Sequence, residues 1–319
     1  MLVLLGRRRG RFDLTAQSDA RSAPVFPTTA VTGAKDTKGD RRRMPELEAW
    51  MRAVETSAAM FREASESLGR AVVAMAEQLP PLEVHWRGGS PIHRYPEKSV
   101  DIALALKLIQ LQGNIRAGEV LICEGLFLEW DVVQRSMHDA LEDAILLAAV
   151  DEKEKIVRRY LDSFFDEDLD KNGELTNRGM VGVQRPEVRR AIERTIGRHG
   201  LPDLGSKMAR LSRQLHRVGS GSVHGRAASI MRAYFEESAP TGLWLGGRRE
   251  RRRTALELPR LRNMTSQTLS TFGLAGVDRW WEPAYCLELI DLGQRLQDAT
   301  DGEIAARKAV GWDDMGDNE

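Results

Sequence analysis

Residues 121–150 read LICEGLFLEWDVVQRSMHDALEDAILLAAV, and this stretch decides the fold class. Apolar residues recur in it every three or four positions, which is the period of one helix face. They are Leu126, Trp130, Val133, Met137, Leu141, Ala144, Ile145 and Ala148. We therefore predict a long helix whose apolar stripe is buried at the centre of a helical core.

The residues just before this stretch predict another helix, which is interrupted at two glycines. Ser99 is placed to cap an apolar run that continues to Leu111. Gly113 and Gly118 then predict an interruption, because glycine punctuates helical patterns. We expect one helix on either side of this interruption, with the two packed together.

The rest of the chain carries further helix patterns. Helices are predicted at residues 154–165, 186–198, 204–218, 225–236, 259–272 and 280–299. Residues 82–98 and 240–253 are predicted as turn-rich connections, the second with a short strand or an ordered loop at 243–245. Because strand and helix patterns do not alternate, we predict an all-α protein with a multihelical bundle over residues 97–310.

The two ends of the chain differ from this central part. Residues 1–43 mix proline, glycine and basic residues without a sustained apolar period, and we predict a disordered arm there. Residues 44–80 predict an amphipathic N-terminal helix that is stopped by Pro80 and Pro81. Residues 311–319 are predicted to be a frayed acidic tail.

Composition limits the classes of partner. Lys and Arg total 47, as do Asp and Glu, so net charge gives no reason to expect a nucleic acid or a membrane surface. No stretch reaches the ~18 apolar residues of a membrane span, and Cys123 and Cys286 suit free thiols of a reducing compartment. We expect a cytoplasmic protein without a membrane span, cofactor or metal. Its partner is open between a second copy and another protein.

One sector of the helix in residues 121–150 is charged. Its members are spaced by three, four or seven positions: Asp131, Arg135, His138, Asp139 and Glu142. Two interpretations fit this spacing. The sector is either a solvated face with ordinary ion pairs between successive turns, or it faces a second polar helix and forms a site.

A glycine-rich segment is the second candidate. Residues 217–225 read RVGSGSVHG and contain Arg217 and His224. The glycines allow a ligand to approach the backbone, and the amides there could form an anion nest. A flexible turn between two helices, with Ser222 as a helix cap, explains the same residues.

Together these segments resemble a known family. The stretch RSMHDAL at 135–141, followed by SGSVHG at 220–225, is similar to uncharacterised bacterial helical proteins that carry an Arg-Ser-x-x-Glu-Ala helix and a later Ser-x-x-x-His-Gly segment. The similarity covers residues 97–236, and Asp139 stands where glutamate is usual. It implies a helical fold and is nearly silent on activity. As a first function class we expect a non-enzymatic helical protein, a partner-binding component of a bacterial stress or defence system, in which Arg135, Asp139 and His224 form a buried polar network.

A second resemblance is to HEPN-type helical ribonucleases, whose signature is an arginine and a histidine separated by four to six residues. Arg217 with His224 is similar to it, and so is Arg194 with His199. The resemblance implies a metal-independent ribonuclease. His224 would then act as acid or base on a ribose 2′-hydroxyl of RNA, and Arg217 would stabilise phosphate charge.

Three further patterns have other interpretations. Residues 168–176, DLDKNGELT, resemble the start of an EF-hand calcium loop, but position twelve is Gly179 rather than glutamate. The basic run GGRRERRR at 246–253 could contact phosphates, although an exposed loop explains it as well. Trp280 and Trp281 are predicted to pack in the core rather than to stack on bases.

Overall fold

The computed structural model describes residues 40–87, 90–165, 183–198, 251–277 and 279–311. Contacts between residues divide the chain into two units, Met1–Arg42 and Arg43–Glu319. Of the first unit, only the beginning of one helix is described. The architecture below is therefore that of the second unit.

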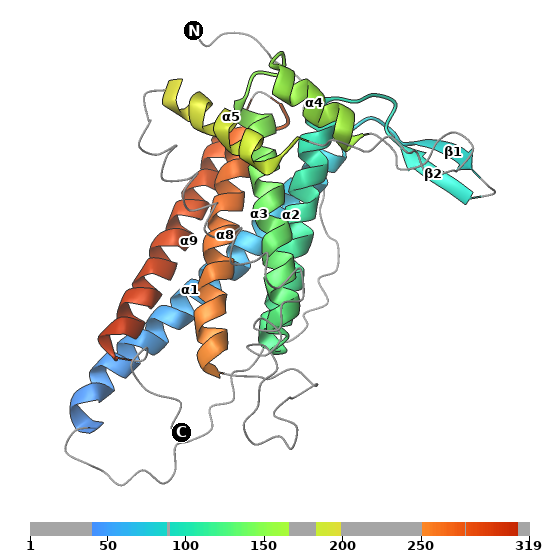
Figure 1. The fold of residues 1–319 in the computed structure, drawn as a ribbon. Helices are drawn as coiled ribbons and strands as arrows, with labels where there is room; N and C mark the ends of the chain where they lie inside the picture. The colour runs from blue at the N-terminus through green and yellow to red at the C-terminus, as the bar shows by residue number, and fades with distance from the viewer. Residues whose placement is uncertain (1–39, 88–89, 166–182, 199–250, 278, 312–319) are drawn as a thin grey trace. The chain divides into compact units, whose positions relative to one another are not determined.

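The described residues form seven helices and one β-hairpin (Figure 1). The helices are α1 (Asp40–Ala76), α2 (Val100–Cys123), α3 (Phe127–Ala149), α4 (Lys155–Phe164), α5 (Arg185–Arg198), α8 (Arg251–Gly276) and α9 (Pro283–Ala309). Strands β1 (Glu83–Arg87) and β2 (Ser90–Arg94) pair antiparallel. The predicted all-α class is confirmed.

The hairpin lies where a turn-rich connection was predicted, so that prediction is wrong for residues 83–94. Two short segments with β-branched and aromatic residues flank Gly88 and Gly89 in the sequence. A two-residue glycine link between such segments is the spacing of a tight hairpin. Reading the glycines as loop residues alone missed the strands on either side.

Helix α1 packs along a narrow seam. It begins at Asp40, earlier than the predicted start at residue 44, and it ends at Ala76. Its buried apolar residues alternate in steps of three and four: Phe61, Ala64, Leu68, Ala71 and Met75. This spacing is typical of helices that pack lengthwise. Met51, an apolar residue nearer the start of the helix, is 49% exposed.

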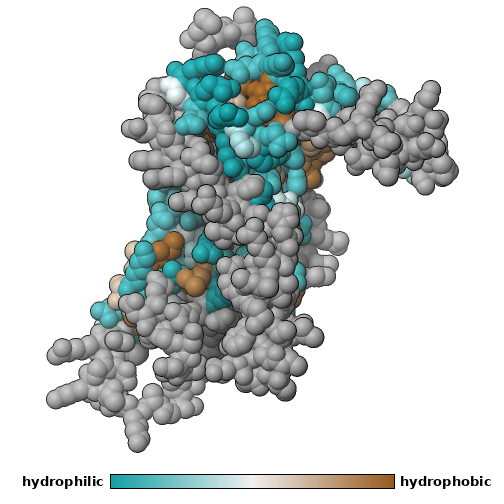
Figure 2. All heavy atoms as spheres, in the orientation of Figure 1, coloured by the Kyte–Doolittle hydropathy of each residue, from teal (hydrophilic) through white to brown (hydrophobic). Residues whose placement is uncertain are grey.

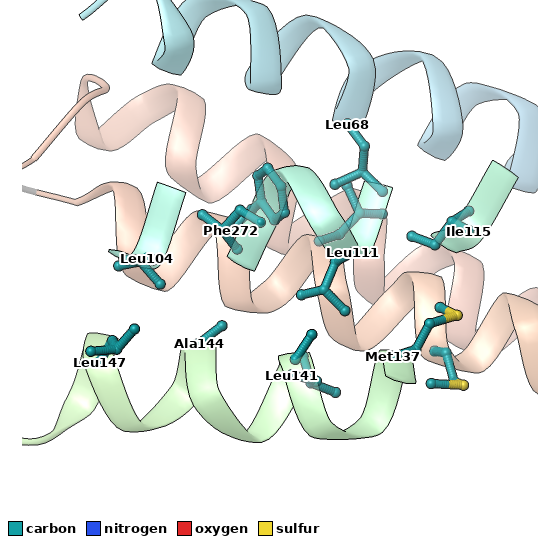
Figure 3. Packing of buried hydrophobic residues seen from close by; sticks show 14 of the residues in the cluster. Leu68, Leu104, Leu111, Ile115, Met137, Leu141, Ala144, Leu147 and Phe272 are labelled. Carbon is teal, nitrogen blue, oxygen red and sulfur yellow. The ribbon is translucent and has the colours of Figure 1, made fainter. Parts of the chain in front are cut away.

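Helix α2 supplies the centre of the core. Ser99 caps it as predicted, because the Ser99 hydroxyl accepts a hydrogen bond from the N–H of Ile102 at 3.2 Å. Side chains of α2 meet side chains of three other helices (Figure 3). The residues labelled there are Leu68 of α1, Leu104, Leu111 and Ile115 of α2, Met137, Leu141, Ala144 and Leu147 of α3, and Phe272 of α8.

The predicted break between Gly113 and Gly118 is wrong. Helix α2 runs through both glycines to Cys123, and the chain turns at Gly125, whose φ of 74° lies in the left-handed region. A Cβ atom on Gly118 would lie 2.4 Å from a ring carbon of Trp130. Gly118 is therefore a packing glycine that lets α2 and α3 approach closely.

A second correction concerns Pro259, which was predicted to begin a helix and instead lies inside α8. Proline has no N–H, so the carbonyl of Ala255, four residues earlier, lacks its donor within the helix. Arg307 of α9 donates a hydrogen bond to that carbonyl at 2.9 Å. A contact between the two helices thus satisfies the group that the proline leaves without a donor.

Helices α8 and α9 form another closely packed pair. A Cβ atom on Gly273 of α8 would lie 2.6 Å from the carbonyl oxygen of Cys286 in α9. Trp281, just before α9, stacks on Phe272 with ring centroids 6.2 Å apart, and Trp280 is buried. The prediction that these two tryptophans pack in the core is confirmed.

The remaining sequence predictions divide between the described and the other residues. Helices α4 and α5 match the predicted helices at 154–165 and 186–198. Residues 1–39 of the predicted arm (1–43), the helices at 204–218 and 225–236, and residues 312–319 of the predicted tail (311–319) lie outside the described residues. Residues 40–43 of the arm belong to α1, so the prediction of disorder is wrong there. Within the described part of the chain, none of the helices is apolar over a length that could cross a membrane.

We expect Gly118→Ala to lower the free energy of unfolding by about 1–3 kcal/mol, because the new methyl group overlaps the indole of Trp130. Gly113→Ala is the matched control, since a Cβ atom there meets nothing within 4 Å. The control should be neutral or stabilising by up to about 1 kcal/mol, because alanine favours helix. Chemical denaturation measures both. Equal effects of the two substitutions would show that the close approach of α2 to α3 is not as described.

Candidate functional site

Charged side chains gather where α3 faces α5, and α5 lies across α3 near the end of α3 (Figure 1). We define the α3–α5 charge cluster as Lys107 of α2, Arg135, Asp139, Glu142 and Asp143 of α3, and Arg185 and Arg189 of α5. Hydrophilic residues dominate the surface over α4 and α5 in Figure 2. The cluster therefore lies at the polar end of the bundle.

Asp143 is the centre of the cluster. Its side chain is only 2% exposed, and it accepts a hydrogen bond from Nη1 of Arg185 at 2.6 Å. Its other oxygen lies 3.1 Å from Nζ of Lys107. Burial alone would lower the pKa of Arg185, but the hydrogen bond with Asp143 and the charges of Asp139 and Glu142 outweigh it and raise that pKa. This buried carboxylate is thus paired with two cations, one at each oxygen.

The predicted pair Arg135 and Asp139 forms directly on α3. Nε of Arg135 donates to Oδ2 of Asp139 at 3.0 Å, one turn apart. The backbone carbonyl of Asp139 also accepts a hydrogen bond from Arg185 at 3.1 Å, and Oδ1 of Asp139 lies 3.9 Å from Nε of Arg185. Asp139 therefore joins the pair within α3 to the ion pairs that reach α5.

Glu142, the residue before Asp143, forms a second ion pair between α3 and α5. Nε of Arg189 donates to Oε1 of Glu142 at 2.7 Å, and both residues are buried. Burial raises the pKa of Glu142, while the hydrogen bond and the charge of Arg189 oppose that effect. The pair orients α5 at a second point along its length.

His138 lies beside this cluster as a neutral group. Burial lowers the pKa of His138 to about 4, with Arg135 and Arg189 acting in the same direction and Asp139 opposing them. Its Nε2 atom is buried and has no hydrogen-bond partner among the described residues. Tyr160 of α4 is also kept uncharged, because burial and the Asp143 carboxylate raise its pKa. The cluster is thus flanked by uncharged groups.

The charged sector of α3 faces a second polar helix, so the interpretation as a solvated face is wrong. Asp131, the first member of the sector, is also buried. The structure brings Arg135 and Asp139 together as the sequence suggested. Arg217 and His224 lie outside the described residues, and the convergence of His224 with that pair stays a prediction.

Other candidate segments also fall largely outside the described residues. These include the calcium-loop pattern at 168–179 and most of the basic run at 246–253. The described end of that run begins α8, where the guanidinium of Arg253 lies 4.4 Å from the centroid of the Phe127 ring. Arg253 therefore packs on the bundle. Within the described ranges, no three His, Cys, Asp or Glu residues gather as metal ligands.

Four members of the cluster were missed by the sequence reasoning. They are Lys107, Asp143, Arg185 and Arg189. A signal was present, because Arg185 and Arg189 are four positions apart, as are Asp139 and Asp143. Two helices whose opposite charges share this spacing can pair along their contact. Nothing in the sequence alone showed that these two helices touch.

A second buried charge pair lies between α1, α8 and α9. Arg262 pairs with Glu303, and the Ser57 hydroxyl donates to the same carboxylate. Arg262 also donates to the Ser57 oxygen at 2.6 Å. Burial lowers the pKa of Arg262 against the opposing effect of Glu303, so the carboxylate keeps the guanidinium charged. This group of three ties the N-terminal helix to the C-terminal pair.

Comparison with known proteins adds no family to this geometry. No protein-family model, curated protein or solved structure matches the chain. The resemblance to bacterial helical proteins, and the one to HEPN-type ribonucleases, stay predictions. Function must be argued from the cluster itself.

We expect Asp143→Ala to lower the free energy of unfolding by about 3–5 kcal/mol, because it leaves Arg185 and Lys107 partly buried without their anion. Asp291→Ala is the control, since Asp291 forms an exposed ion pair with Arg295 at a similar distance of 3.0 Å. That pair should contribute about 1 kcal/mol or less. Chemical denaturation of both variants at low salt is the measurement. Comparable losses would contradict the central role of Asp143.

We expect His138 to make the protein less stable as the pH falls from about 6.5 to about 4. The unfolded chain takes up a proton near pH 6.5, but folded His138 takes it up only near pH 4, so protons favour unfolding in this window. The contribution is about 3 kcal/mol over the window. Denaturation of wild type and His138→Gln at pH 7, 6, 5 and 4 measures it. If the free energies of unfolding of the two proteins changed in parallel with pH, this contribution of His138 would be ruled out.

Proposed function

We propose that this chain is a partner-binding helical protein with no catalytic step of its own, in which the α3–α5 charge cluster fixes the position of α5. We place it in the bacterial cytoplasm as a component of a stress or defence system. The proposal assigns the cluster a structural role rather than a chemical one.

The observation that carries the proposal is the double pairing of Asp143. A general base must come within hydrogen-bond reach of the proton that it takes from a substrate. Asp143 is buried between Arg185 at 2.6 Å and Lys107 at 3.1 Å, so each of its oxygens is paired with a cation and its side chain is only 2% exposed. A carboxylate held in this way is suited to joining helices.

The remaining charges of the cluster support the same role. Asp139 pairs with Arg135, and Glu142 pairs with Arg189, so each carboxylate of the cluster has a cation within 3.0 Å. Buried ion pairs add little net stability compared with apolar packing, but they disfavour other arrangements because a separated charge is costly. They therefore favour one position of α5 on α3.

The composition of α5 explains why the bundle needs these pairs. Only three apolar residues of α5 are buried among those the structure describes: Val188, Ala191 and Ile192. Two of its arginines, Arg185 and Arg189, face α3 instead. So small an apolar contact specifies register weakly, and the charged pairs supply the specificity.

The test of this proposal is an RNA-cleavage assay on the full chain with single-stranded RNA and no added metal. We expect wild type and His224→Ala to leave the RNA intact. His93→Ala is the control, since His93 is an exposed histidine of β2. Cleavage by wild type that is lost in His224→Ala and in Arg217→Ala, at an unchanged melting temperature, would overturn the proposal in favour of the ribonuclease alternative.

A further inference from the structure

Strand β1 has one edge that pairs with no strand of the described residues. The sheet that the described residues form has two strands, in the order β1–β2, so one side of β1 pairs with β2 and the other pairs with no described strand. Two apolar residues of β1 are exposed, Trp86 at 73% and Val84 at 51%. A lone two-stranded hairpin is marginally stable in water, and a sheet with more strands is more stable.

The two outer edges of this hairpin are not equivalent. Pro91 of β2 stands opposite Trp86, and proline is found in a sheet where its nitrogen faces away from the neighbouring strand. The outer edge of β2 therefore lacks a donor at Pro91, which is a common way to protect an edge from pairing. Strand β1 contains no proline. Its edge is the one open to another strand.

The position of Pro91 also determines which backbone groups of β1 face outward. In an antiparallel pair, opposed residues alternate between those that exchange hydrogen bonds and those that do not. Because Pro91 cannot donate, Trp86 and Pro91 form a pair of the second kind. Val84 is two residues from Trp86, so the backbone groups of both residues point to the free edge.

The sequence of β1 is complementary to itself when it is read antiparallel about His85. Val84 of one copy then stands opposite Trp86 of the other, which places the two outward-facing residues in hydrogen-bonding register. Glu83 stands opposite Arg87, so an acidic position meets a basic one at each end of the pairing. Moving the register by two residues loses this match of charges.

We propose that two copies of this chain associate through their β1 strands and form a four-stranded antiparallel sheet in the order β2-β1-β1-β2. A twofold axis passes between the two His85 residues. The inference rests on the proposed function in that the protein acts by association, and it names a second copy as the partner. It does not depend on the α3–α5 charge cluster.

The sheet that results has a continuous apolar patch. Val84 and Trp86 lie two positions apart, so they share one face of β1, and Pro91 is their neighbour on β2. The twofold axis places Trp86 of the second copy beside Val84 on that face. Cross-strand pairs of aromatic and β-branched residues stabilise sheets. Other exposed apolar side chains, such as Leu274 and Leu287, are on helices and have no such symmetric counterpart.

We expect a weak dimer, because edge pairing of two five-residue strands buries less surface than a typical stable interface. Sedimentation velocity of the full chain from about 1 to about 500 µM should show a monomer–dimer equilibrium in the micromolar range or above. A protein that stays monomeric over this range overturns the inference. If such a monomeric protein also leaves RNA intact, the proposed function stands without the dimer.

The first variants test the edge. Val84→Pro removes an outward N–H while keeping the hydrogen bonds to β2, and Trp86→Lys places a charge on the edge. Each should weaken dimerisation at least tenfold, with unchanged helical circular dichroism. Leu287→Lys is the matched control, since Leu287 is an exposed apolar residue of α9, and it should dimerise as wild type does. A dimer that Val84→Pro leaves unchanged uses another surface and overturns the inference.

A cross-linking experiment tests the register. The two His85 residues would form a pair without hydrogen bonds, whose Cα atoms are about 4.5 Å apart, within the range of a disulfide. His85→Cys should therefore give a covalent dimer on mild oxidation. Glu83→Cys should not, because its two copies would be about 13 Å apart along the strands. Wild type, with Cys123 and Cys286, gives the background. Cross-linking of Glu83→Cys but not His85→Cys would refute this register.

Discussion

The close approach of α2 to α3 at Gly118 and Trp130 is the constraint on which the rest of the bundle depends. The indole fills the space that a side chain on Gly118 would occupy, and its Nε1 donates to Glu257 of α8 at 3.0 Å. A fully buried Trp130 thus joins three helices at one point, with its only polar atom satisfied. Because this contact fixes α3, it also determines which carboxylates of α3 face α5.

The helices of this bundle are held by two kinds of contact. The pair α8 and α9 packs closely at Gly273 and also shares the hydrogen bond from Arg307 to Ala255 and the buried pair Arg262–Glu303. Helix α5 buries few apolar residues and is held by its ion pairs with α3. Apolar contacts tolerate small shifts, whereas a buried ion pair loses most of its attraction when a charge is displaced. The bundle therefore combines an adaptable core with a specific attachment at its polar end.

Periodicity in the sequence predicted which segments are helical, because burial of a stripe depends on spacing alone. It failed at Gly118 and at Pro259, where a neighbouring helix determines the structure. The ring of Trp130 occupies the space that a Cβ atom on Gly118 would take, and Arg307 donates the hydrogen bond that Pro259 cannot give to the carbonyl of Ala255. The same distinction applies to the candidate site, where pairs within one helix were predictable and pairs between helices were not. Arg135 and Asp139 are one turn apart, so their pairing was predictable. The pair of Asp143 and Arg185 joins two helices, and no spacing within either one reveals it.

The hairpin was missed for a related reason, which bears on its role. Strands are recognised by an apolar face that alternates with a polar one, and that alternation arises because one face is buried. Here Val84 and Trp86 alternate with polar residues, but both are exposed, so no described core contact pins their register. A strand whose apolar face meets no core among the described residues can be completed by pairing with a strand of another chain. The self-complementary sequence around His85 supplies such a pairing with a second copy.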